Sequence, residues 1–327
     1  PFVMACWFDS GCAPFAQWHH PFDGGETFNS SFPVDYICEG VDQTRGWFYT
    51  LLAVSTTVFD LPAYKRCLSL GLILDAEGKK MSKSRGNIVD PWDHFNREGA
   101  DATRWYMISN SNPWENLKFD LNGIDEVRRK FFGTLYNIYA FFSLYSNIDG
   151  YDKNEVMIPY ESRRELDRWI ISGLNSLIQK VESAYTDYDP TKSSRLISQF
   201  VQDDLSNWYV RLSRRVFWKG EYNDEKISAF QTLHECLTKI AIISSPISPF
   251  YMDQLFQDLT NDDNSVHLAN FPKVDTHNID SELEKKIKKS QMICSIALSI
   301  RKREKIKVRP VSYTHLRAHE TKANLVC

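Results

Sequence analysis

The stretch from Gly78 to Asn87 reads GKKMSKSRGN, and it decides how this 327-residue chain is interpreted. It follows an apolar run, Cys67 to Leu74, that is typical of a buried parallel strand, and it precedes a helix-start signal at Asp90-Pro91. A loop at the carboxyl end of such a strand lies where open α/β sheets bind their ligands. Its small residues allow movement, and its cations can stabilise charge on phosphate oxygens. These cations are Lys79, Lys80, Lys83 and Arg85. The alternative is a solvated polar loop without a ligand.

Three motifs near the start of the chain share one resemblance. Lys80 to Ser84 reads KMSKS, Glu39 to Phe48 reads EGVDQTRGWF, and Trp7 to Gly11 reads WFDSG. The first motif is the signature of class I aminoacyl-tRNA synthetases, and the other two resemble the isoleucyl-tRNA synthetases within that class. The resemblance implies an aminoacyl-tRNA ligase that activates isoleucine with ATP and transfers it to tRNA(Ile). A valyl enzyme is the nearest alternative, and the second and third motifs disfavour it.

The same resemblance implies a role for each motif residue. ATP, as its complex with Mg²⁺, would be bound by Lys80, Met81, Ser82, Lys83 and Ser84. Lys80 and Lys83 would be catalytic, because their ammonium groups can neutralise the departing pyrophosphate. The aminoacyl-adenylate would be bound by Glu39, Gly40, Asp42, Gln43 and Trp47. Without the resemblance, an acidic residue at a strand end is ordinarily a helix cap. A non-catalytic tRNA-binding module is a second alternative, but a decayed site need not retain these charged residues.

The order of patterns along the chain predicts an α/β domain followed by an all-α domain. Residues 1–90 alternate strand-like runs with a helical pattern, as in the second half of a Rossmann-like parallel sheet. Residues 91–150 read as a helical connecting layer. Residues 151–310 read as a helical bundle that resembles the anticodon-binding domain of the isoleucyl, valyl, leucyl and methionyl enzymes. Residues 311–327 have no periodicity and look like a non-native tail.

Two basic segments of the bundle are candidates for contact with tRNA. Arg211, Arg214 and Arg215 follow an aromatic pair, and guanidinium groups near aromatic rings suit phosphates and unpaired bases. The alternative is ion pairing along the helix, since Arg211 and Arg215 are spaced i, i+4. The segment from Lys285 to Lys307 reads as a basic amphipathic helix, which is either a solvated face or a contact to the tRNA backbone.

Composition limits the possible classes of protein. The formal net charge is −3, so any RNA contact must come from local basic patches. The seven cysteines are scattered without a CxxC pair, which predicts reduced thiols and a cytoplasmic location. No apolar stretch reaches membrane-spanning length, so no membrane partner is expected. A monomer is expected.

Several features of the intact family are missing from the sequence. Neither the amino-terminal HIGH-type motif nor the editing domain is visible, and His19-His20-Pro21-Phe22 is not that motif. The chain starts at Pro1 without an initiator Met, so we expect it to begin inside a longer protein. The isolated fragment is therefore expected to be inactive, although its parent is a ligase. His315 and His319 lie beside Glu320 without a third ligand, so no zinc is predicted.

Overall fold

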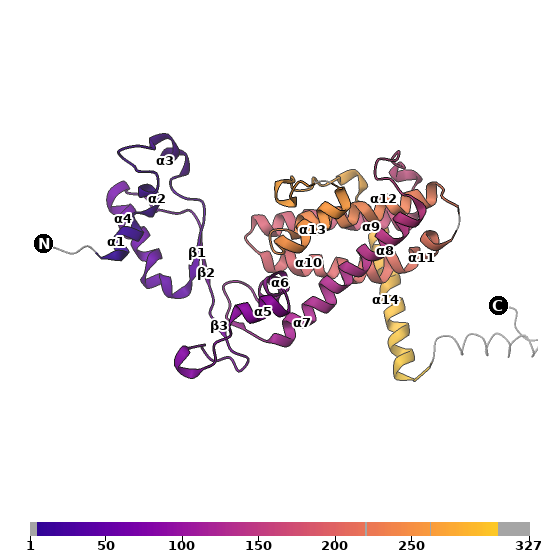
Figure 1. Ribbon diagram of the computed structural model, residues 1–327, viewed down its shortest axis with the longest axis horizontal. Coiled ribbons are helices and arrows are strands. Elements are labelled where there is room, and N and C mark those ends of the chain that lie inside the picture. Colours follow the sequence, from indigo (N-terminus) through magenta and orange to yellow (C-terminus); the bar gives the residue numbers. More distant parts are fainter. Residues whose placement is uncertain (1–4, 220, 262, 307–327) are drawn as a thin grey trace, which may run out of the picture.

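The computed structural model describes residues 5–219, 221–261 and 263–306, apart from the side chain of Lys83 (Figure 1). The first elements of the chain gather on the left of Figure 1, and a larger bundle of helices lies on the right. Short parallel strands occur only before this bundle among the described residues. The fold class predicted from the sequence, α/β followed by all-α, is confirmed.

The N-terminal part is a pair of parallel strands with helices packed against it. β1 (Ile37–Gly40) pairs with β2 (Cys67–Leu70), and α4 (Trp47–Phe59) makes the crossover between them. Phe48 and Leu51 on α4 are buried in the same small core as Ile37. The expected strand-helix-strand unit is therefore present. The remaining elements of this part are α1 (Cys6–Gly11), α2 (Ala13–Ala16), α3 (Gly25–Ser31) and a 3-10 turn, η1 (Val41–Arg45).

The apolar run Cys67–Leu74, expected as one strand, is divided between two partners. Only its first half belongs to β2, whereas Ile73–Leu74 forms β3, which pairs in parallel with β4 (Leu117–Lys118). At the joint, a Cβ on Gly71 would lie 2.2 Å from the carbonyl oxygen of Glu115, so this close approach of two backbones requires glycine. The chain thus leaves the edge of β1 and continues along the segment that contains β4.

The linking helices also depart from the expected pattern. α5 (Pro91–Arg97) and α6 (Ala100–Asn110) form as the sequence predicts. The helical spacing of the apolar residues from Leu121 to Tyr145 predicts a single helix with an aromatic stripe in the core. The structure has instead α7 (Leu121–Val127), a π-helical turn, η3 (Arg128–Phe132), and α8 (Gly133–Asp149). Trp105 stacks on Phe131 in that turn, with ring centroids 4.1 Å apart, and both side chains are buried. The aromatic stripe of this segment is therefore core, as predicted.

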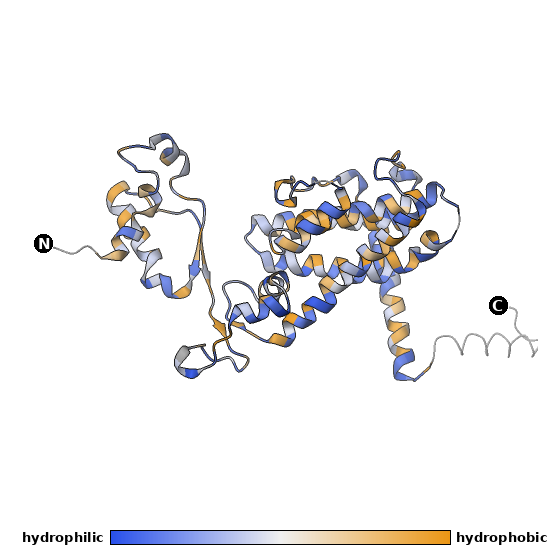
Figure 2. Cartoon of the chain, in the orientation of Figure 1, coloured by the Kyte–Doolittle hydropathy of each residue, from blue (hydrophilic) through white to orange (hydrophobic). Residues whose placement is uncertain are grey.

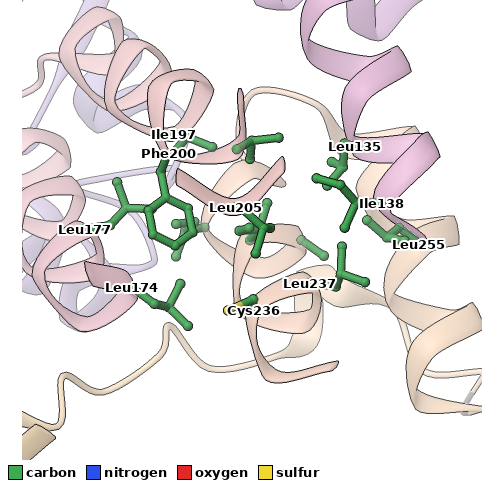
Figure 3. Close-up of a cluster of buried hydrophobic side chains, with 14 of the residues drawn as sticks. Leu135, Ile138, Leu174, Leu177, Ile197, Phe200, Leu205, Cys236, Leu237 and Leu255 are labelled. Atoms are coloured by element: carbon green, nitrogen blue, oxygen red, sulfur yellow. The ribbon is translucent and has the colours of Figure 1, made fainter. Parts of the chain in front are cut away.

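The bundle packs around one apolar core. Figure 3 shows Leu174, Phe200, Leu205 and Leu237 among the side chains that meet there. Trp105, from the expected connecting layer, belongs to the same core. The elements of the bundle are α9 (Glu165–Thr186), α10 (Pro190–Gln199), the π-helical segment η5 (Phe200–Val210), α11 (Arg211–Trp218), α12 (Asp224–Ser244) and α13 (Pro249–Thr260).

The last described helix, α14 (Ser281–Arg303), extends away from the bundle (Figure 1). Its first turn is attached to α9, because Glu284 accepts hydrogen bonds from Ser172 at 2.5 Å and Ser176 at 2.8 Å. Further along, Met292 and Ile293 are more than half exposed, and Figure 2 shows hydrophobic residues along this outer part. In the described part of the chain, no helix has the length and hydrophobicity needed to cross a membrane.

Candidate functional site

The flap, defined as residues 75–87, is held at its base by two residues that the sequence patterns did not single out. The side-chain amide of Asn87 donates to Asp75 Oδ2 at 2.8 Å, and its Oδ1 accepts the Ser82 N–H at 2.9 Å. Asp75 Oδ1 accepts the Lys79 N–H at 2.7 Å. These bonds, above all the one from Asn87, lower the pKa of the Asp75 carboxyl group. A polar residue at each end of a glycine-containing loop is the signal that could have identified them.

The motif residues of the flap lie beyond this base. Lys80 forms an isolated antiparallel bridge with β3, and Lys83 begins a short 3-10 turn. The Lys80 side chain is exposed, and no carboxylate of the described residues pairs with it. Met81 is half-buried, and the hydroxyl groups of Ser82 and Ser84 lie 3.2 Å apart. The side chain of Lys83 is outside the described part of the chain.

Replacing Asn87 with alanine is expected to loosen the flap, because it removes the side-chain contacts to Asp75 and Ser82. Limited trypsin digestion followed by mass spectrometry should show cleavage within the flap accelerated by about tenfold. Asn154→Ala is a matched control, because its side chain bonds only to Asp152 in another loop. Equal flap cleavage in the two variants would show that Asn87 does not order the flap.

The turn after β1 connects two of the three motifs. Gln43 Oε1 accepts the backbone N–H of Trp47 at 2.9 Å, which fixes the first turn of α4. The indole N–H of Trp47 donates to the carbonyl oxygen of Ser10 at 3.0 Å. The WFDSG segment, which is helical as α1, therefore packs beside the start of α4. Because its N–H is already bonded, Trp47 can offer only its apolar ring to a ligand.

The acidic residues of this turn lie at the carboxyl end of β1. Gly40 is the last residue of β1 and stands opposite Leu70 of β2. Glu39 and Asp42 are exposed on either side of it. Within the described residues, neither carboxylate accepts a backbone N–H from the first turn of a helix, so helix capping does not account for them. In this part of the chain, Asp42 accepts only the side-chain amide of Gln43, at 3.4 Å. The flap begins after β3, so the acidic turn follows the end of a strand in one sheet and the flap follows the end of a strand in the other.

The three candidate arginines of α11 are all exposed. The guanidinium carbon of Arg214 lies 6.0 Å from the ring centroid of Trp218. In the part of the chain that the structure describes, none of Arg211, Arg214 and Arg215 forms an ion pair, so pairing along the helix is not observed. Their charges are therefore available to a ligand from solvent.

A buried polar network reaches α11, because Arg164 Nη2 donates to Ser213 Oγ at 3.3 Å. Asp167 on α9 is fully buried and accepts two hydrogen bonds from Arg164, at 2.9 and 2.5 Å. It also accepts the hydroxyl protons of Tyr209 at 2.8 Å and Ser228 at 3.1 Å. Burial, reinforced by the nearby Asp167 charge, raises the pKa of Tyr209 well above its ordinary value. Because Tyr209 lies in the π-helical segment η5, this network joins that segment to α9 and α12.

A groove of about 590 Å³ runs between η5 and α14. Trp208 lines one side of it, and Lys285, Lys288 and Lys289 line the other. A half-buried indole beside several ammonium groups suits a base and its phosphates. The expected tRNA-backbone segment, Lys285 to Lys307, thus contributes to a groove on the bundle, although Lys307 lies outside the described residues.

No group of three or more His, Cys, Asp or Glu side chains in the described residues is arranged to hold a metal ion. His315, His319 and Glu320 lie outside those residues.

Comparison with known proteins defines the class. Residues 2–120 match the family model described as tRNA synthetases class I (I, L, M and V), and residues 167–311 match the anticodon-binding domain of tRNA ligase. The ternary complex of Agrobacterium radiobacter K84 LeuRS with tRNA and LeuAMS superposes with a TM-score of 0.67, at 18% identity, over 86% of this chain and 34% of that chain. Mycobacterium tuberculosis methionyl-tRNA synthetase in complex with methionyl-adenylate superposes with a TM-score of 0.64, at 20% identity, over 78% of this chain and 50% of that chain. The chain belongs to the class I aminoacyl-tRNA synthetases.

Within this class, the sequence is similar to isoleucine–tRNA ligases. It is 54% identical to that of Cytophaga hutchinsonii over 97% of the chain, and 53% identical to that of Bacteroides thetaiotaomicron over 94%. The chain spans 30% and 27% of the lengths of these curated relatives.

Proposed function

We propose that the protein carrying this chain is an isoleucine–tRNA ligase, which activates isoleucine with ATP and transfers it to tRNA(Ile). The observation that carries this proposal is the 54% identity to the Cytophaga hutchinsonii ligase, which extends over the flap, the acidic turn and the bundle. The flap and the acidic turn supply chemistry suited to the first step. The match to an anticodon-binding domain supports the second.

The flap is the proposed ATP site. Its motif residues, Lys80 to Ser84, would hold ATP, which brings Mg²⁺ as part of the substrate complex. Such a reaction asks for alignment and charge stabilisation more than for covalent chemistry by the protein. Lys80 and Lys83 are the proposed catalytic residues, because ammonium groups on a loop can follow charge onto the departing pyrophosphate. The absence of a carboxylate partner for Lys80 within the described residues supports this role.

The acidic turn is the proposed aminoacyl-adenylate site. Glu39 and Asp42 offer carboxylates that can bind the substrate ammonium group, and the lack of a side chain on Gly40 lets the Asp42 carboxylate lie against the strand end. Gln43 is proposed to line the same site while it holds the start of α4. The bonded indole of Trp47 leaves its ring face for the aliphatic side chain of isoleucine.

The bundle is the proposed tRNA-binding part. Arg211, Arg214 and Arg215 would contact tRNA on α11, and the lysine-lined groove of α14 would contact its backbone. We propose the domain division made from the sequence: a partial catalytic domain at 1–90, a connecting layer at 91–150, an anticodon-binding domain at 151–310 and a non-native tail at 311–327. We also propose a cytoplasmic monomer, and the free state of the six described cysteines supports a reducing compartment.

The function can be tested with a chimera, in which residues 2–310 of this chain replace the matching segment of the Cytophaga hutchinsonii ligase. The chimera is expected to catalyse isoleucine-dependent ATP–pyrophosphate exchange and to charge tRNA(Ile) at rates near those of the intact relative. Circular dichroism would confirm that it is folded. A folded chimera that exchanges pyrophosphate better with valine, or with no amino acid, would contradict the assignment.

A further inference from the structure

A pair of stacked tyrosines joins the N-terminal strands to the bundle. Tyr36 directly precedes β1, and Tyr188 lies in the turn between α9 and α10. Their ring centroids are 4.9 Å apart and their planes differ by 9°. The guanidinium carbon of Arg66 lies 5.3 Å from the centroid of the Tyr188 ring, and its Nη1 donates to the Tyr188 hydroxyl at 3.4 Å. Aromatic stacking and a cation–π contact therefore meet on one side chain of the bundle.

The turn holds Tyr188 in a conformation that this residue type seldom adopts. Its φ is +58°, in the left-handed region that favours glycine or asparagine. Two backbone hydrogen bonds close the turn. The Tyr188 N–H donates to the carbonyl oxygen of Tyr185 at 3.1 Å, and the Asp189 N–H donates to the carbonyl oxygen of Ala184 at 2.8 Å. Asp189 also caps α10 by accepting the Lys192 N–H at 2.8 Å. A bulky residue kept at positive φ between two helices indicates that its ring has a function which offsets the strain.

The two partners of Tyr188 belong to the strands that lead to the proposed adenylate site. The N–H of Ile37, the residue after Tyr36, donates to the carbonyl oxygen of Arg66 at 3.0 Å. This bond links the start of β1 to the residue that precedes β2. β1 and β2 then remain paired as far as Gly40. Only Ile37 and Cys38 lie between Tyr36 and Glu39 of the acidic turn, and both are paired with β2. The strand pairing holds the geometry of the turn itself, so the Tyr188 contact sets where the strand pair lies against the bundle.

We propose that Tyr188 is a positioning residue for the transfer step: its contacts with Tyr36 and Arg66 set the orientation of the tRNA-binding bundle against the strands that carry the adenylate site. This inference rests on the proposed function. Adenylate formation does not use the bound tRNA, whereas transfer needs the tRNA to be aligned with the adenylate. Tyr188 therefore acts on the second step and leaves the first unchanged.

The decisive variant is Tyr188→Asn in the chimera, because asparagine tolerates a positive φ and removes only the ring. We expect kcat/KM for charging of tRNA(Ile) to fall by about tenfold, with ATP–pyrophosphate exchange within about twofold of the parent. Tyr188→Phe keeps the stack and is expected to restore most of the charging. Tyr136→Ala, which removes an exposed tyrosine of α8 outside this contact, is the control and is expected to charge normally.

Two results would overturn the positioning role. One is normal charging by the folded Tyr188→Asn variant. The other is an equal loss of pyrophosphate exchange and charging, which would indicate a general effect on folding.

A second measurement does not depend on catalysis. Hydrogen–deuterium exchange of the 327-residue chain should show faster exchange around Tyr36 and Arg66, at residues 34–36 and 64–66, in Tyr188→Asn but not in Tyr188→Phe, while the paired residues of β1 and β2 stay protected. Unchanged exchange in Tyr188→Asn would mean that the ring does not hold the strands. If the parent chimera lacked isoleucine-dependent exchange, the proposed function would fail, and this measurement would still decide whether the contact is formed.

Discussion

Replacement of Lys83 with alanine is expected to slow isoleucyl-adenylate formation in the chimera by about 10²- to 10³-fold. The reason is that charge accumulates on the pyrophosphate as the bond to the α-phosphorus breaks, and an ammonium group on a mobile flap can stabilise that charge when it appears. An interaction made chiefly in the transition state lowers kcat and kcat/KM together when it is removed. The measurement is ATP–pyrophosphate exchange at varied isoleucine and ATP, together with the Kd for isoleucine, which should stay unchanged.

Lys79→Ala is the matched control on the same flap. The backbone of Lys79 is bonded to Asp75, and this contact survives the loss of the side chain. We expect its exchange rate to stay near that of the parent. If Lys83→Ala raised only the KM for isoleucine, or if both variants lost the same activity, Lys83 would not have the proposed role.

Replacement of Asp167 with alanine is expected to destabilise the chain by about 3 kcal/mol, because it leaves Arg164 and the buried hydroxyl of Tyr209 without their shared acceptor. Urea unfolding followed by circular dichroism would measure the loss. Glu182→Ala, at an exposed position of the same helix, should change the free energy of unfolding by less than about 0.5 kcal/mol. Similar losses in the two variants would show that the network contributes little.

Much of the fold could be predicted because its signals are local. Apolar runs and helical periodicity locate the strands and helices, and the motif spacing predicts the strand-to-helix turn. The division of the run Cys67–Leu74 into two strands was not predictable in this way. It depends on the close contact between the backbones of Gly71 and Glu115, and the segment around Glu115 has no strand pattern in the sequence. The π-helical segments at Arg128–Phe132 and Phe200–Val210 were also missed, because they keep an apolar face that reads as ordinary helix.

The same contrast applies to the candidate site. The three motifs located the flap and the acidic turn, and the roles given to their residues stay predictions. Asp75 and Asn87 went unnoticed, because their importance comes from a hydrogen bond that closes the flap. Tyr188 carried no signal at all, since a tyrosine in a polar turn reads as an exposed residue. Its meaning depends on Tyr36, which only the folded chain brings beside it.

The joint at Gly71 separates the flap from the first sheet. β2 is paired with β1 as far as Leu70. From Gly71 on, the chain bonds to the segment around β4: the Gly71 N–H donates to the carbonyl oxygen of Pro113 at 2.9 Å, and the Leu72 N–H donates to Asn116 Oδ1 at 2.8 Å. The flap and the segment around β4 are thus fastened to each other, and they meet the first sheet through a short stretch of backbone that includes a glycine. A change of backbone angles between Leu70 and Gly71 would let both move as one unit over the proposed ATP site without opening a β1–β2 hydrogen bond.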